Sequence, residues 1–173
     1  MRPAAPLDMD VGIMYNVHMS VAEKLVEILK AQGLTCATAE SCTGGGIGSA
    51  ITSVPGSSEV FAGGVISYSN AVKRDVLGVS QESLDRYGAV SSEVACEMAL
   101  GARRLLKTDL AVSVTGIAGP GGGSAEKPVG LVWFGVSTAN GTRTEKAIFS
   151  GDRAGVRSQA VVHALGMLTV AAT

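Results

Sequence analysis

The run TCATAESCTGGG at residues 35–46 determines the architecture of this chain more than any other segment. Its first part, residues 35–39, has the short and largely apolar pattern of a buried strand. Its second part places Ser41 ahead of three consecutive glycines, and a helix with Ile47 and Ile51 on its inner face is predicted to follow. A strand that passes directly into a helix is typical of an open α/β sheet, in which ligands bind beyond the carboxyl ends of the strands.

Upstream of this run the sequence predicts a helix over residues 21–32. Ser20 and Glu23 have the spacing of a capping box at its start, and Gly33 suits its end. Residues 1–18 carry one arginine, two aspartates and no apolar core, so they lack the features of a secretory signal. We expect them to form a flexible tail.

Strands and helices alternate along the rest of the chain. Strands are predicted at residues 60–67 and 110–114, and Asn140-Gly141 joins two more, 129–137 and 142–149, as a hairpin. Helices are predicted at residues 71–77, 81–87, 91–107 and 156–170, with Ser80, Ser91 or Ser92, and Asp152 as caps. This order predicts an α/β protein: a three-layer α/β/α sandwich with a mixed, mostly parallel sheet and one C-terminal hairpin, in a single domain over residues 19–173.

Composition excludes several classes of function. Of the 173 residues 46% are hydrophobic and 17% charged, which suits one folded domain with a sizeable core. The formal net charge of −1 lacks the basic excess of a nucleic-acid binder. No apolar run approaches the roughly 20 residues of a membrane helix. We therefore expect neither a nucleic-acid nor a membrane partner.

Cysteine usage gives a further limit. Cys36, Cys42 and Cys96 form no CxxC pair, and His18 and His163 lie far from them in the sequence. An odd number of cysteines with this spacing argues against a disulfide framework and against a zinc site, so no metal is expected. A reducing, cytoplasmic setting fits best.

Ser41 occupies a position that suits a nucleophile. The free N–H groups and the dipole at a helix start favour negative charge, so a serine hydroxyl there can attack a carbonyl while neighbouring amides hold the oxyanion. The simpler alternative is that Ser41 or Thr43 only caps the helix, which is a common role of both residue types. Glu40 also has two interpretations, since it could orient a base or act as the cap.

Two other segments carry candidate chemistry. The glycine-rich run at residues 115–124 follows the most apolar predicted strand, and its backbone donors could cradle a phosphate or a sugar; the alternative is a connection with no ligand. Residues 67–73, SYSNAVK, place Tyr68 and Lys73 at another strand-to-helix junction. A lysine with a lowered pKa can activate a serine, and Tyr68 could relay the proton, although a lone helix lysine is more commonly solvated.

Two residues compete with these assignments or extend them. Cys42 is the rival nucleophile, although a small cysteine early in a helix is more commonly core filler. Arg153 opens the last predicted helix and could reach an anionic substrate or simply lie on the surface.

AESCTGG at residues 39–45, VISYSNAVKRDVLGV at 65–79 and TGIAGPGGG at 115–123, in this order and spacing, closely resemble the CinA C-terminal domain family. The resemblance covers about residues 20 to 172, nearly the whole chain. It implies a nicotinamide-nucleotide amidase, which converts nicotinamide mononucleotide to nicotinate mononucleotide and ammonia in pyridine nucleotide salvage. It implies no cofactor. The family also has a longer form with an additional N-terminal domain, which we expect to be absent here.

The resemblance assigns roles residue by residue. Ser41 matches the family's proposed nucleophile, Lys73 its proposed general base, and Tyr68 the tyrosine beside that base. Positions that surround the ligand are matched by Thr43, Gly44, Gly45, Asn70, Thr115, Gly116 and Gly119. In the implied mechanism a neutral Lys73 takes the proton of Ser41, directly or through Tyr68, and N–H groups near residues 43–45 hold the oxyanion.

Other hypotheses stay open at this point. The same loops could belong to a non-catalytic module, related to competence and DNA-damage proteins, that binds a nucleotide or a protein partner. A cysteine amidase that uses Cys42 is a weaker alternative. The expected partner is a small-molecule nucleotide. A homo-oligomer is an open question, because burial within one chain explains the apolar faces equally well.

Overall fold

The computed structural model describes the backbone of residues 9–173 and the side chains from Ser20 onward. Its centre is a five-stranded sheet in the order β2-β1-β3-β4-β5. The strands are β1 (Cys36–Glu40), β2 (Phe61–Ile66), β3 (Leu110–Gly116), β4 (Leu131–Thr138) and β5 (Gly141–Ile148). β1 pairs in parallel with β2 and β3, whereas β4 runs antiparallel to both β3 and β5. The sheet is therefore mixed, with its parallel pairing confined to the first three strands.

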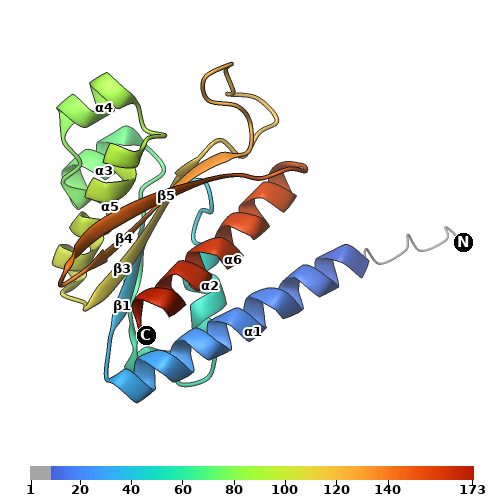
Figure 1. Cartoon of the computed structure of the whole chain (residues 1–173), viewed down its shortest axis with the longest axis vertical. Coiled ribbons are helices and arrows are strands. Elements are labelled where there is room, and N and C mark those ends of the chain that lie inside the picture. The colour runs from blue at the N-terminus through green and yellow to red at the C-terminus, as the bar shows by residue number, and fades with distance from the viewer. Residues whose placement is uncertain (1–8) are drawn as a thin grey trace, which may run out of the picture.

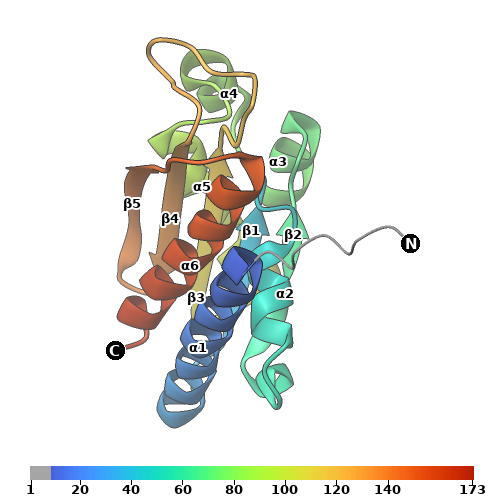
Figure 2. The ribbon, with the colours of Figure 1, turned by 90° about the vertical axis from the view of Figure 1, so that its right-hand side faces the viewer.

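Helices cover both faces of the sheet (Figures 1 and 2). One layer contains α1 (Met9–Gln32), α2 (Gly46–Thr52) and α6 (Arg153–Ala171), and the other contains α3 (Asn70–Leu77), α4 (Gln81–Tyr87) and α5 (Ser92–Leu106). A short 3₁₀ turn, η1 (Ser57–Glu59), precedes β2. Each layer buries its own apolar cluster against the sheet. The predicted three-layer α/β/α sandwich with one C-terminal hairpin is confirmed.

Local sequence signals account for most element boundaries. Ser80, Ser91 and Asp152 each accept a hydrogen bond from the backbone N–H three residues later, as expected of N-cap residues. Gly33 follows α1 with a positive φ, and the backbone reverses between β4 and β5 at Asn140-Gly141. None of the helices among residues 9–173 combines the length and the apolar character that crossing a bilayer requires.

The start of α1 differs from the prediction. The helix begins at Met9, so Ser20 lies within it and is not its N-cap. A capping box matters only where the first N–H groups have no helical partner, and the preceding turns of α1 remove that need at Ser20. The predicted flexible tail is therefore helical from Met9 on, and residues 1–8 lie outside the described residues.

Strand β3 is also longer than predicted. It extends through Thr115 and Gly116, which pair with Trp133 and Val132 of β4. The predicted ligand loop consequently begins at Ile117, and its two first predicted members belong to the sheet.

Candidate active site

Glu40 organises the turn between β1 and α2. Its carboxylate is 1% exposed and accepts hydrogen bonds from the Thr43 hydroxyl at 2.7 Å and from three backbone N–H groups, those of Gly45, Ile47 and Gly48, at 2.8–3.0 Å. These N–H groups lie at the start of α2, which a carboxylate stabilises. Glu40 therefore caps α2, and the interpretation of Ser41 or Thr43 as the cap is wrong.

The glycines after Thr43 are required by the backbone. Gly44 and Gly45 both lie in the left-handed region, with φ of 61° and 96°. A Cβ atom on Gly45 would also come within 3.1 Å of Ile66 on the edge strand β2. The turn can thus reverse tightly enough to bring three N–H groups of α2 back onto Glu40.

Ser41 and Lys73 meet at the carboxyl edge of the parallel strands. Lys73 Nζ lies 3.0 Å from Ser41 Oγ and donates to the carbonyl of Ser67 at 2.7 Å. Lys73 is 1% exposed and Ser41 9% exposed. Ser69 caps α3 and fixes the helix that carries Lys73. The alternative of a solvated helix lysine is wrong, because tertiary packing covers this amine almost completely.

Burial sets the protonation behaviour of Lys73. Desolvation lowers the pKa of Lys73 below its ordinary value, because the charged amine loses its hydration. In the neutral amine one N–H can donate to Ser67 while the lone pair accepts the Ser41 hydroxyl proton. The pair therefore has the geometry of a nucleophile and its general base.

Tyr68 lies apart from this pair. Its side chain is 63% exposed, and its hydroxyl accepts a hydrogen bond from Arg153 at 3.2 Å. Arg153 also donates to the carbonyl of Gly119 at 2.9 Å, so it joins the segment after β2 to the glycine-rich loop. Since Lys73 contacts Ser41 directly, a tyrosine relay between them is unnecessary. Tyr68, Arg153 and Gly119 are instead joined to one another by these two hydrogen bonds, and this group is called the rim below.

The remaining predicted ligand positions differ in what they offer. Thr115 is buried, and its hydroxyl donates to the carbonyl of Ala89 between α4 and α5. Gly116 lies in β3, where a Cβ atom would collide with Val132. Asn70 is exposed at the first turn of α3. Of the three, only Asn70 presents its side chain to solvent beside the site.

Arg157 on α6 was not anticipated by the sequence reasoning. Its guanidinium donates to the carbonyl of Cys42 at 3.1 Å and to that of Thr43 at 2.9 Å. The available signal was its spacing of four residues from Arg153, which places both arginines on one face of the helix. No local pattern indicates that the partner of such an arginine lies about 115 residues upstream.

Cys42 does not have the environment of a nucleophile. Its side chain is 6% exposed, and burial raises the pKa of its thiol to about 11. A thiolate, the reactive form, is thus disfavoured near neutral pH. Cys42→Ala is expected to turn over substrate at close to the parental rate, measured by initial-rate assays at equal folded concentration. Loss of turnover in a variant that keeps the parental Tm would instead favour the cysteine mechanism.

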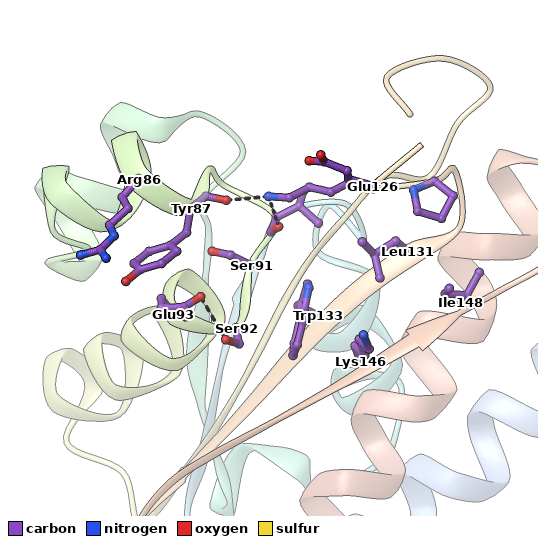
Figure 3. A pocket seen from close by; sticks show the side chains of 13 residues that line it. Arg86, Tyr87, Ser91, Ser92, Glu93, Glu126, Leu131, Trp133, Lys146 and Ile148 are labelled. Atoms are coloured by element: carbon purple, nitrogen blue, oxygen red, sulfur yellow. Dashed lines mark hydrogen bonds between the residues drawn. The ribbon is translucent and has the colours of Figure 1, made fainter. Parts of the chain in front are cut away.

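Neither Ser41 nor Lys73 lines the cavity in Figure 3. It has a volume of about 410 Å³ and opens between the α4–α5 connection and strands β4 and β5, with Tyr87 and Trp133 in its wall. Lys127, from the glycine-rich loop, donates to the carbonyls of Tyr87 and Val90 there. None of the predicted site residues lines this cavity. Its wall instead contains the hydrogen bonds by which Lys127 attaches the glycine-rich loop to the α4–α5 connection.

Among the described residues, no cluster of three or more His, Cys, Asp or Glu side chains is arranged to hold an ion.

The fold and this site define a class of protein: an α/β sandwich with a serine and a buried lysine in contact at the edge of its parallel strands. The chain belongs to the CinA C-terminal domain family, whose model matches residues 18–171.

Individual relatives support this assignment. The nicotinamide-nucleotide amidohydrolase PncC of Escherichia coli K12 is 50% identical over 151 residues, which cover 87% of this chain and 92% of that protein. A CinA-like protein of Parasynechococcus marenigrum is 53% identical over 152 residues, 86% of this chain and 36% of that protein. The chain thus spans most of the shorter relative and about a third of the longer one. The crystal structure of competence/damage inducible protein CihA from Agrobacterium tumefaciens matches with a TM-score of 0.87 at 44% identity, over 90% of this chain and 95% of that chain.

Proposed function

We propose that this protein is a nicotinamide-nucleotide amidase, which hydrolyses the carboxamide of nicotinamide mononucleotide to nicotinate mononucleotide and ammonia. The observation that carries the proposal is the 3.0 Å contact between Ser41 Oγ and the amine of Lys73, which is almost fully buried. The similarity to PncC, which covers 92% of that amidohydrolase, supports the choice of reaction.

Acylation uses the serine and the lysine together. The lone pair of neutral Lys73 takes the hydroxyl proton, and Ser41 Oγ forms a bond to the carboxamide carbon while the carbonyl π pair moves onto oxygen. When that pair returns, the C–N bond breaks and protonated Lys73 gives its proton to the leaving nitrogen, so that ammonia departs. The result is an ester between Ser41 and the nicotinate group.

Deacylation repeats the sequence with water. Lys73 takes a proton from the water as it attacks the ester carbon, and then returns a proton to Ser41 Oγ as the ester bond breaks. The net change is amide plus water to carboxylic acid plus ammonia. Lys73 ends neutral and Ser41 protonated, as both began, and the steps require no metal or cofactor.

Arg153 suits the anionic end of the substrate. Its guanidinium is exposed at the rim and is already oriented by Tyr68 and by the carbonyl of Gly119. A guanidinium binds phosphate oxygens with charge-assisted hydrogen bonds. We assign Arg153, with Tyr68, Asn70 and the Gly119 loop, to the ribose phosphate, while the carboxamide occupies the space at Ser41.

The proposal includes a cytoplasmic setting and a small-molecule partner without nucleic acid. All three cysteines are free thiols, which suits a reducing compartment. The formal net charge of −1 gives the chain no general attraction for a polyanion.

The experiment that tests the function is an ammonia-release assay on the purified protein with nicotinamide mononucleotide. Free nicotinamide serves as the control substrate, because it has the same carboxamide without the ribose phosphate. We expect brisk turnover of the nucleotide and little of the free base. Binding of the nucleotide without ammonia release would instead support the non-catalytic module.

The pH dependence of turnover follows from Lys73. Only the neutral amine can accept the serine proton, so kcat/KM is expected to fall as pH drops through the pKa of Lys73 and to level off above it. Because burial lowers this pKa, the midpoint should lie below the value of about 10.4 for an ordinary lysine. Initial rates at low substrate across the pH range, with circular dichroism to show that the protein stays folded, measure it. A midpoint at the ordinary lysine value would contradict the proposed base.

A further inference from the structure

Arg157 and Lys73 contact the turn at residues 41–45 from different helical layers. Arg157 lies on α6, in the layer with α1 and α2, whereas Lys73 lies on α3 in the other layer (Figures 1 and 2). Two of its nitrogens donate to two consecutive carbonyls, those of Cys42 and Thr43. A cationic side chain thus holds the peptide units directly after the proposed nucleophile.

Peptide geometry gives these bonds a consequence on the other side of the turn. In a trans peptide the C=O and N–H vectors are antiparallel. Because the Cys42 carbonyl accepts a hydrogen bond from Arg157, the N–H of Thr43 in the same peptide unit points away from that guanidinium. Arg157 therefore fixes the direction of a backbone donor that it does not contact.

The neighbouring donors of the turn are already committed. The N–H of Gly44 donates to the carbonyl of Ser41, and that of Gly45 donates to the Glu40 carboxylate. The expected oxyanion donors at residues 43–45 are thereby reduced to one. Among the hydrogen bonds formed by residues 20–173, none uses the N–H of Thr43.

We infer that Arg157 is a positioning residue for the amidase reaction: by binding the Cys42 and Thr43 carbonyls, it aims the Thr43 N–H at the oxyanion that forms when Ser41 attacks the carboxamide. This inference rests on the proposed function. The guanidinium also polarises the peptide unit, because a hydrogen bond to a carbonyl strengthens the N–H of that unit as a donor. A donor fixed in advance stabilises the transition state without reorganisation.

The shape of the side chain is part of the role. A guanidinium presents several N–H donors in a rigid plane and can hold two adjacent carbonyls at once. A lysine amine carries charge on a single nitrogen. Arg157→Lys should therefore keep the charge near the turn but lose the simultaneous hold on both carbonyls.

The test compares Arg157→Ala and Arg157→Lys with Arg103→Ala. Arg103 is the matched control. Its guanidinium also donates a partly buried hydrogen bond, to the Ser137 hydroxyl, which lies outside the turn at residues 41–45. For Arg157→Ala we expect kcat to fall about 10²- to 10³-fold, the usual loss on removal of an oxyanion donor, with KM changed only a few-fold. Arg157→Lys should lie between this variant and the parent. Guanidinium ion at millimolar concentration should restore part of the kcat of Arg157→Ala and leave Arg103→Ala unaffected.

Each other outcome overturns the inference. A parental kcat in Arg157→Ala, a loss that falls mainly on KM, or a loss that guanidinium does not reverse would show that Arg157 does not act through the Thr43 donor. If Arg157→Ala does not fold, the test is made with Arg157→Lys. A parental kcat in that variant would show that the simultaneous hold of the guanidinium on both carbonyls is not needed. Failure of the proposed function is distinguishable, because the parent itself would then release no ammonia.

Discussion

Ser41→Ala is expected to bind nicotinamide mononucleotide with an affinity within a few-fold of the parent, while ammonia release falls roughly 10⁴- to 10⁶-fold. In the proposed mechanism Oγ of Ser41 forms the ester intermediate, and no other group of the site replaces this atom. Binding is retained because the assigned phosphate contacts come from Arg153 and the Gly119 loop. Isothermal titration calorimetry measures the affinity, and a coupled ammonia assay measures turnover.

Ser53→Ala is the matched control for this prediction. Ser53 follows α2, is exposed, and donates its hydroxyl to the carbonyl of Ser49, which lies in that helix. It loses the same atoms at a position with no role in the chemistry, so its kcat should match that of the parent. Ser41→Ala with parental ammonia release would show that the reaction does not pass through a serine ester.

Lys73→Met is the second variant with a large expected effect. A positioned general base typically contributes about 10²- to 10⁴-fold, so kcat should fall within that range while nucleotide affinity stays near the parental value. Methionine fills most of the buried space without charge, which separates the loss of the base from the creation of a cavity. The measurement is kcat from ammonia release at saturating substrate.

The parent and Lys73→Met should also differ in how their stability depends on pH. Burial lowers the pKa of Lys73 in the folded state, so the folded protein loses this proton at a lower pH than the unfolded chain does. Between that lowered pKa and about 10.4 the unfolded chain binds more protons, and the parent therefore gains stability relative to Lys73→Met as pH rises. Tm against pH for both proteins measures it.

Arg74→Met provides the control for Lys73→Met. Arg74 is the next residue on α3, but its side chain is exposed and pairs with Asp75 at 2.7 Å. Its removal takes away a charge of the same sign from the same helix without touching Ser41. Lys73→Met with a turnover close to that of Arg74→Met would show that the buried amine is not the base.

The layered fold could be predicted because its signals are local. The strand-to-helix run at residues 35–46, the hairpin dipeptide Asn140-Gly141 and the caps Ser80 and Asp152 each restrict the backbone within a few residues. The start of α1 was predicted wrongly for the same reason. A capping pattern at Ser20 is visible locally, whereas the continuation of the helix upstream to Met9 overrides it.

The proposed site depends on long-range packing, which limits what the sequence can reveal. Ser41 and Lys73 could be singled out from their junctions, but the burial that lowers the pKa of Lys73 arises only when its side chain reaches Ser41, directly after β1, in the folded chain. Glu40 had two equal interpretations until its carboxylate was found to face the N–H groups of α2. The contact of Arg157 joins the last helix to the first turn, and nothing in its neighbourhood in the sequence indicates that partner.

The most direct measurement is an NMR titration of Lys73 in the folded protein, with the ε-carbon signal assigned by comparison with Lys73→Met. We expect a pKa for Lys73 below that of an ordinary lysine, and a midpoint of the kcat/KM profile that coincides with it. A Lys73 signal that titrates at the value of the exposed lysines, or a turnover midpoint that does not follow it, would contradict the claim that the buried amine activates Ser41.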